Sequence, residues 1–236
     1  MNIEALADEV IQRLRNFTNR ERQDATQNYF PSKQQNLGVY AADLRGVVRD
    51  IKKRINGESS ADVLKLALAI IARNTLEGRQ AAYEILESHK TAVAALRARD
   101  IEALGEGIDN WASVDGFACG ISGKAWREGR LKDADIKRWA RSKDPWWRRA
   151  AVVSTVPLNL QSRGGTGDTP RTTMVCQLVV GDDHVMVHKA LSWALRELSR
   201  RDAKAVRAFL KKHDAELPAL VKREVLRKLT TGKKNG

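Results

Sequence analysis

Apolar side chains recur at helical spacing along almost the whole chain, and this pattern constrains the fold more than any other feature. Residues 3–14 carry one apolar stripe, and comparable stripes follow at about 40–55, 60–73 and 77–88. Further stripes lie near 109–127, 132–141, 146–160, 170–180, 184–200, 202–213 and 216–229. Strand-like alternation of apolar and polar residues is missing. The sequence therefore predicts an all-α protein of about a dozen short helices.

Glycine and proline mark where these helices end and begin. Gly57 and the pair Gly105 and Gly107 are expected to break helices, and Asp144 followed by Pro145 is typical of a helix start. Short helices joined by short turns favour antiparallel pairs, as in an α-solenoid of HEAT-like helix pairs with a loose period of about 35–40 residues. A compact helical bundle is the alternative. A solenoid curves, and its inner helices would form a concave face lined with Arg and Lys.

The charge balance indicates the class of partner. The chain has 42 Lys and Arg against 29 Asp and Glu, a formal net charge of +13. Basic surfaces gain affinity for nucleic acid because binding releases the counterions condensed on the polyanion. A pure solubility effect would be the ordinary explanation, but the excess is spread through the folded part and is not confined to one tail. We therefore expect a nucleic-acid partner.

One segment does not fit the helical pattern. Residues 158–170 are polar, and glycines at 164, 165 and 167 are unfavourable inside a helix. We expect a surface loop here, either a passive insertion or an arm that reaches DNA through Arg163 and Arg171. Because Gly-rich surface loops carry little packing, deletion of 161–168 is expected to spare the fold.

The remaining organisation is simple. Residues 1–230 are predicted to form a single repeat domain, followed by a frayed basic tail at 231–236. The N-terminal segment lacks the apolar core of a signal peptide, and no apolar run approaches membrane-spanning length. Cys119 and Cys176 give no metal-binding spacing and are typical of reduced thiols. We expect a cytoplasmic protein, nucleoid-associated in a bacterium, without metal, cofactor, membrane contact or obligate protein partner, and acting as a monomer.

The candidate chemistry lies among the six Trp residues. Trp111 and Asp115 are four residues apart, so a helix would place both on one face, one turn apart. A carboxylate beside an indole on an otherwise apolar turn is costly unless the ion has a function or a partner. The alternative is an ordinary surface aspartate beside a packing tryptophan.

Two further segments combine indoles with cations. In DPWWRRAAVV, Arg149 follows Trp146 by three residues, and Arg148 lies between them in sequence. In HKALSWALREL, Lys189 and Trp193 share a face, while Leu191, Ala194, Leu195 and Leu198 form the core stripe. Trp193 is therefore not required for the core. Each segment alone also fits a basic helix at the surface.

Together these three segments supply what one reaction requires. An N-alkylated purine carries a positive charge, so it already leaves deoxyribose readily. The bond breaks through an oxocarbenium-like sugar that needs a nearby negative charge and a positioned water. Asp115 would supply that charge, the indole faces would hold the cationic nucleotide, and Arg149 would clamp a phosphate. No strong general acid is needed when the leaving base is charged.

These residues resemble those of the AlkD-like DNA alkylation-repair family. The resemblance rests on NWASVD with Trp111 and Asp115, on WWRRAA with Trp146 and Arg149, and on KALSWALRE with Trp193. LGVYAADLR at 37–45, which ends at Arg45, and EGRQAAYEIL at 77–86 are similar to earlier helices of that family. The likeness spans about 37–229. It departs from the best-known pattern at position 110, where Asn replaces a second Trp, and in the longer Gly-rich segment.

The resemblance implies a horseshoe of HEAT-like helix pairs that cups duplex DNA without a cofactor. It implies a monofunctional glycosylase that excises N3- and N7-alkylated purines without drawing the lesion into a deep pocket. Trp111 and Trp193 would then cradle the deoxyribose, and Asp115 would stabilise the oxocarbenium and its water. Arg149, Arg148, Trp146, Lys189 and Arg45 would contact DNA.

Two other functions remain open. A non-catalytic HEAT-repeat protein that binds DNA shape or branched DNA would use the same basic face and make Asp115 incidental. A protein-interaction scaffold is the third, although its partners would not call for a net charge of +13.

Overall fold

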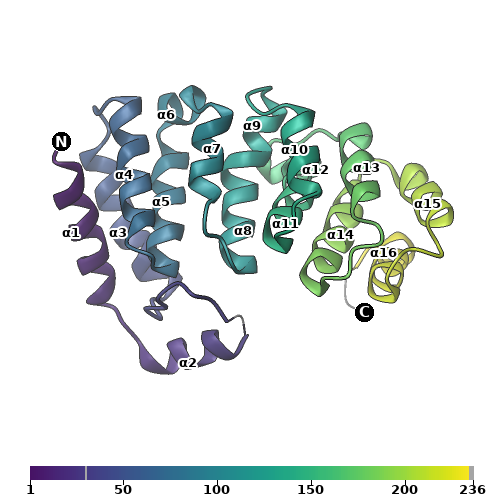
Figure 1. Ribbon diagram of the computed structural model, residues 1–236, viewed down its shortest axis with the longest axis horizontal. Coiled ribbons are helices and arrows are strands. Elements are labelled where there is room, and N and C mark those ends of the chain that lie inside the picture. Colours follow the sequence, from purple (N-terminus) through teal and green to yellow (C-terminus); the bar gives the residue numbers. More distant parts are fainter. Residues whose placement is uncertain (30, 234–236) are drawn as a thin grey trace. The chain divides into compact units, whose positions relative to one another are not determined.

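The computed structural model describes residues 1–29 and 31–233, and Figure 1 shows helices joined by short connections. Within those residues there is no β-strand, only a single bridge between Gln35 and Thr75. The predicted all-α class is confirmed. In the same residues no helix is both long and apolar enough to cross a bilayer. The chain divides into two compact units, Met1–Ile121 and Ser122–Gly236, and a single domain over 1–230 stays a prediction.

The first unit is built from short helices in two layers. Its helices are α1 (Ile3–Arg15), α2 (Arg20–Tyr29), α3 (Ala41–Arg54), α4 (Ser60–Ala72), α5 (Leu76–Ser88), α6 (Lys90–Ala95), α7 (Ala98–Gly105) and α8 (Trp111–Phe117). Helices α3, α5 and α8 pack side by side in that order, and α4 packs on α1, α5, α6 and α7 (Figure 1). The three residues between α4 and α5 are too few for anything but an antiparallel pair.

The predicted apolar stripes form the core of this unit. In α1 the stripe from Leu6 to Leu14 is buried, and in α3 the predicted face is fully buried (Leu44, Val47, Val48, Ile51). In α4 the stripe is partly shifted: Leu66 and Ile70 are buried, whereas Leu64 and Leu68 are only half-buried. The shift follows from α4 being packed on both of its flanks by α1 and α5, so that its apolar surface extends around most of the helix.

Helix α2 was not predicted, because it lacks an apolar stripe. None of its described side chains is buried. Two hydrogen bonds of Gln23 fix its position. The Gln23 Nε2 donates to the Leu37 carbonyl at 3.2 Å, and the Gln23 carbonyl accepts from Asn36 Nδ2 at 2.9 Å. The helix is thus held by polar contacts to the segment that follows it, and not by a hydrophobic face.

The second unit contains α9 (Gly123–Arg127), α10 (Asp133–Ala140), α11 (Pro145–Val153), α12 (Val156–Asn159), α13 (Thr169–Leu178), α14 (Val185–Leu198), α15 (Ala203–Lys212) and α16 (Ala219–Thr231). Helix α14 packs between α11 and α16 and also contacts α12 and α13, whereas α10 packs on α11 and α13. As predicted, the side chain of Asp144 caps α11 and Pro145 occupies its first turn. Of the predicted tail, Thr231 ends α16, and 234–236 lie outside the described residues.

The expected bounds of the Gly-rich loop are wrong at both ends. Leu158 and Asn159 are buried in α12, and Thr169 and Pro170 belong to α13. Between them lies one 3₁₀ turn, Gln161–Arg163, followed by glycines at 164, 165 and 167. The reason is local: Pro157 is favoured in the first turn of a helix, and the side chain of Asp168 caps the next one.

This loop is also more tightly held than a passive insertion. Arg201 donates to the carbonyls of Asn159 and Gly165, at 2.8 and 2.9 Å. Arg127 donates to the carbonyls of Pro157 and Arg163, at 3.0 and 2.7 Å. Arg171, expected as a DNA-reaching residue of the loop, instead lies over the Trp126 ring and pairs with acidic groups. We therefore no longer expect deletion of 161–168 to spare the fold.

Substitution of Gly165 by Ala should destabilise the second unit by about 1–3 kcal/mol, because an added methyl overpacks a closed site. A Cβ at this position would lie 2.5 Å from the Pro157 carbonyl oxygen, and backbone cannot move aside cheaply. Gly181→Ala is the matched control, since its Cβ would meet nothing within 4 Å. Equal denaturant midpoints for the two variants would show that the loop is loosely packed.

Candidate functional site

Helix α8 carries the first pair of candidate residues. Trp111 is its first residue and Asp115 lies one turn further on, so both occupy one face, as predicted. Both side chains are half-buried, whereas Val114 and Phe117 of the same helix are fully buried. The helix therefore presents an indole and a carboxylate together while its apolar face anchors it in the unit.

Asn110 explains the departure from the family pattern before Trp111. It caps α8: its Oδ1 accepts a hydrogen bond from the Ser113 backbone N–H at 2.9 Å. Its Nδ2 donates to Ser113 Oγ at 3.1 Å, and the side chain is fully buried. Asn is among the residues best suited to this position, which a Trp could not fill in the same way.

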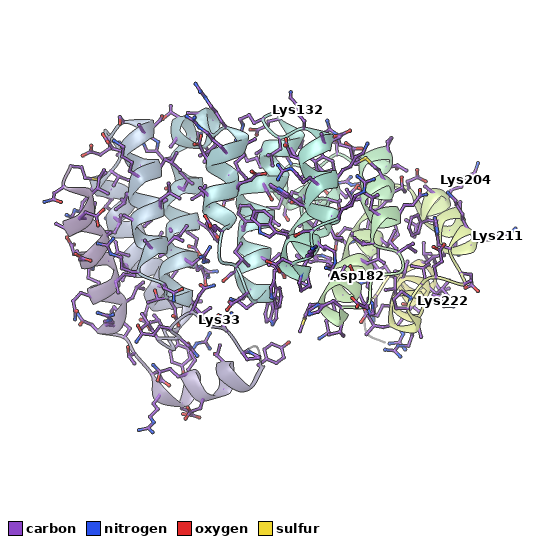
Figure 2. The ribbon with its side chains drawn as sticks, viewed as in Figure 1. Lys33, Lys132, Asp182, Lys204, Lys211 and Lys222 are labelled. Carbon is purple, nitrogen blue, oxygen red and sulfur yellow. The ribbon has the colours of Figure 1, made fainter. Side chains whose placement is uncertain are left out.

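The carboxylate of Asp109 ties the start of α8 to the segment after α2. Ser32 Oγ donates to Asp109 Oδ1 at 2.6 Å, the Lys33 backbone N–H donates to Oδ2 at 2.5 Å, and Gln34 Nε2 donates to Oδ1 at 3.2 Å. Lys33 is labelled in Figure 2. Burial alone would raise the pKa of Asp109, but these hydrogen bonds, with one from Asn110, outweigh it and lower the pKa. The ionised form therefore holds this junction.

A buried arginine supports α8 from behind. Arg79 of α5 donates to Gln34 Oε1 at 3.1 Å, to the Leu104 carbonyl at 3.3 Å and to the Glu106 carbonyl at 2.9 Å. It also donates to the Tyr83 hydroxyl at 3.2 Å, which itself donates to the Leu104 carbonyl at 2.8 Å. These bonds fix both the segment after α2 and the chain entering α8, so they set where α8 lies.

Tyr29 is a residue that sequence reasoning did not find. Its ring meets Trp111 edge to face, with centroids 5.6 Å apart and planes at 84°. The side chain is nevertheless 69% exposed. An exposed aromatic held against a candidate site residue adds a third group to this face. The only sequence signal was an aromatic at the end of a polar stretch, which carries no specific meaning.

In the second unit, Arg149 lies in α11 and reaches the start of α14. It is only 5% exposed, and its Nη1 donates to the Met186 carbonyl at 2.5 Å. Trp146, three residues earlier, is half-buried and meets the His184 ring at 5.7 Å. Trp146 and Arg149 thus both contact residues at the start of α14. Arg149 is more deeply placed than a surface cation at a helix start would be.

Arg148 forms an ion pair with Asp182, the residue labelled in Figure 2 in the turn before α14. Its Nε and Nη2 donate to the two carboxylate oxygens at 2.5 and 3.1 Å, and Nη1 donates to the carbonyls of Ser142 and Lys143. The hydrogen bonds raise the pKa of Arg148, and they lower that of Asp182 although burial opposes this. The geometry assigns Arg148 a positioning role, and its DNA contact stays a prediction.

Helix α14 carries the third group. Leu191, Ala194, Leu195 and Leu198 are fully buried, as predicted for the core stripe. Trp193 is half-buried and Lys189, four residues earlier, is exposed, so neither belongs to the packed face. Arg45 lies in α3 of the first unit and is exposed beside a surface hollow.

Comparison with known proteins shows which family and which solved structure this chain is similar to. The family model for the DNA alkylation repair enzyme matches residues 10–229. A solved structure described as a predicted DNA alkylation repair enzyme from Enterococcus faecalis is similar in fold, with a TM-score of 0.74 at 16% identity, covering 91% of this chain and 97% of that one. No curated protein matches the sequence significantly.

Proposed function

Because the chain belongs to the family of DNA alkylation repair enzymes, whose role is the repair of alkylated DNA, we propose that it is a monofunctional DNA glycosylase. Its substrates are positively charged N3- and N7-alkylated purines in duplex DNA. The observation that carries the proposal is α8, which holds Trp111 and Asp115 half-buried on one face. It acts as a monomer in the cytoplasm, on nucleoid DNA if the source is bacterial.

The chemistry follows from the charge of the lesion. The bond between C1′ and N9 of the alkylated purine breaks with its electron pair leaving on the base, which thereby becomes neutral. The sugar becomes an oxocarbenium-like cation, and the Asp115 carboxylate stabilises it. A water held by that carboxylate then adds to C1′ and loses a proton, leaving an abasic site. Each of these steps needs a fixed carboxylate, and the Asn110 cap and the Asp109 junction fix the helix that bears it.

The other site residues supply binding. Trp111 and Trp193 contact the damaged nucleotide, whose positive charge interacts favourably with an indole face. Arg149 and Lys189 contact phosphate, and Trp146 and Arg148 support them. In the second unit the support for this is local: Arg149 contacts the start of α14, the helix that carries Trp193 and Lys189, and Arg148 contacts Asp182 in the turn before it.

Release of free base tests the proposal. Wild-type protein incubated with a duplex containing a single N7-methylguanine should yield 7-methylguanine and one abasic site per turnover. Chromatography of the free base and alkaline cleavage of the strand measure the two products. A bifunctional enzyme would cut the strand without alkali, so uncleaved abasic product is expected.

The same assay distinguishes the proposed glycosylase from a non-catalytic protein that binds DNA shape or branched DNA. A protein that only senses DNA shape would bind a four-way junction at least as tightly as the damaged duplex and release no base from either. Tight junction binding without base release would overturn the proposed activity and leave the family's scaffold as a DNA-binding module.

A further inference from the structure

The backbone of Met186, in the first turn of α14, is held by two side chains. Its N–H donates to His184 Nδ1 at 3.3 Å, and its carbonyl accepts from Arg149 Nη1 at 2.5 Å. Arg149 belongs to α11, which packs along α14 (Figure 1). His184 and the arginine to which the proposed function assigns a phosphate therefore meet at one residue.

His184 is the N-cap of α14. Its backbone is extended, with φ −88° and ψ 121°, as is usual for the residue before a helix. Its ring satisfies one of the backbone N–H groups for which the first turn of a helix has no carbonyl partner. Only a neutral imidazole has a lone pair on Nδ1, so the ring hydrogen lies on Nε2 in this arrangement. The cap therefore depends on the orientation of the ring.

Two contacts with fixed partners orient this ring. It meets the ring of Trp146 with centroids 5.7 Å apart and planes at 70°, and both side chains are half-buried. The backbone N–H of His184 donates to Asp182 Oδ1 at 2.9 Å, and Asp182 is ion-paired with Arg148 of α11. The ring and the backbone of His184 are thus both tied to α11, which keeps Nδ1 directed at the N–H of Met186.

The Met186 carbonyl is a determinant of where the guanidinium of Arg149 lies. Arg149 is only 5% exposed, so its side chain has little freedom to adjust to a phosphate. Because a guanidinium binds phosphate through donors in a fixed planar geometry, its orientation decides whether the contact forms. Fraying of the first turn of α14 would move the carbonyl that holds this group. The cap on α14 therefore stabilises the bound orientation of Arg149.

We propose that His184 is a positioning residue for DNA binding: by capping α14 it fixes the Met186 carbonyl and, through it, the guanidinium of Arg149. His184 itself touches neither the phosphate nor the reacting atoms. The inference rests on the proposed function, in which Arg149 contacts a phosphate of the damaged duplex, and it names the residue that keeps this arginine in place. Loss of the cap weakens affinity and leaves the bond-breaking step intact.

Two substitutions at His184 separate the cap from the ring contact. His184→Asn keeps a capping acceptor and loses the ring, whereas His184→Phe keeps an aromatic ring against Trp146 and loses the acceptor. Affinity for a duplex with one N7-methylguanine should fall about 3- to 10-fold in His184→Phe and stay within about twofold of the wild type in His184→Asn. Titration of a labelled duplex measures both affinities. Equal affinities of the two variants, or the opposite order, would overturn the inference.

A double-variant cycle tests whether the effect passes through Arg149. The loss of affinity caused by His184→Phe should vanish when Arg149 is already replaced by Ala. The slope of log affinity against log salt should become shallower by up to about 0.9 in His184→Phe, the value of one phosphate contact, although no charge is removed with a neutral ring. An equal loss of affinity with and without Arg149 would contradict a role through this arginine.

His89 provides the matched control, because its Nδ1 caps α6 in the first unit by accepting from the Ala92 N–H at 3.2 Å. His89→Phe removes an equivalent cap and should leave affinity and salt slope as in the wild type. Equal losses in the two Phe variants would reduce His184 to a general contribution to stability and would refute the inference. The single-turnover rate of base release by His184→Phe at saturating protein should be retained. Failure of the proposed function appears separately, as absent base release by the wild type.

Discussion

Asp115→Asn should lower the single-turnover rate of 7-methylguanine release by about 10²–10³-fold, because it removes the charge that stabilises the oxocarbenium-like sugar. The substitution keeps the size of the side chain and its place on α8, where it is half-buried. Affinity for the damaged duplex should be unchanged or slightly tighter, since a carboxylate near phosphates is removed. Rate is measured at saturating protein, and affinity by titration of a labelled duplex.

The control is another aspartate whose loss changes net charge equally. The side chain of Asp214 is 72% exposed and contacts none of the candidate site residues, so its conversion to Asn should leave both rate and affinity as in the wild type. A thermal melt of each variant excludes unfolding as the cause of a lower rate. An Asp115→Asn protein with full activity would remove Asp115 from the mechanism and would favour a function in DNA binding alone.

Arg79→Ala should lower the free energy of unfolding of the first unit by about 2–4 kcal/mol, because buried acceptors lose their donors at about 1–3 kcal/mol each. Arg79 is only 4% exposed, and its loss leaves Gln34 Oε1 and the Glu106 carbonyl without this hydrogen-bond donor. For a chain of this length the melting temperature should fall by about 10 °C. Urea denaturation followed by circular dichroism measures the change.

Arg99→Ala provides the comparison for this variant. Its side chain is 79% exposed, so its removal should change stability by less than about 0.5 kcal/mol. Because Arg79 also fixes the chain that enters α8, base release by Arg79→Ala should decline below the melting transition as well. Unchanged stability would mean that water replaces the guanidinium at every acceptor.

Local patterns in the sequence predicted most helices correctly, because burial of a periodic apolar face needs only neighbouring residues to specify it. Asp144 and Pro145 mark the start of α11 in the sequence as they do in the structure. The expected segment 109–127 is helical from Trp111 to Arg127, but it contains a π-helical turn at Ala118–Ser122. Its apolar residues continue through this turn, so periodicity alone could not reveal it.

The site was predictable only within single helices. The shared face of Trp111 and Asp115 follows from their spacing of four residues. The contacts that hold this helix in place could not be predicted from spacing, because Ser32 and Asp109 are 77 residues apart in the chain. Likewise, nothing in one sequence indicates that Tyr29 meets the ring of Trp111. Asn110 offered a local signal, since Asn before an apolar turn is a common helix cap.

In the proposed mechanism, the positive charge of the lesion replaces a general acid. The direct measurement compares base release by the wild type from two otherwise identical duplexes, one with cationic N7-methylguanine and one with neutral O6-methylguanine. We predict release of 7-methylguanine and none of O6-methylguanine. Equal release of both bases, or release of neither, would contradict this mechanism.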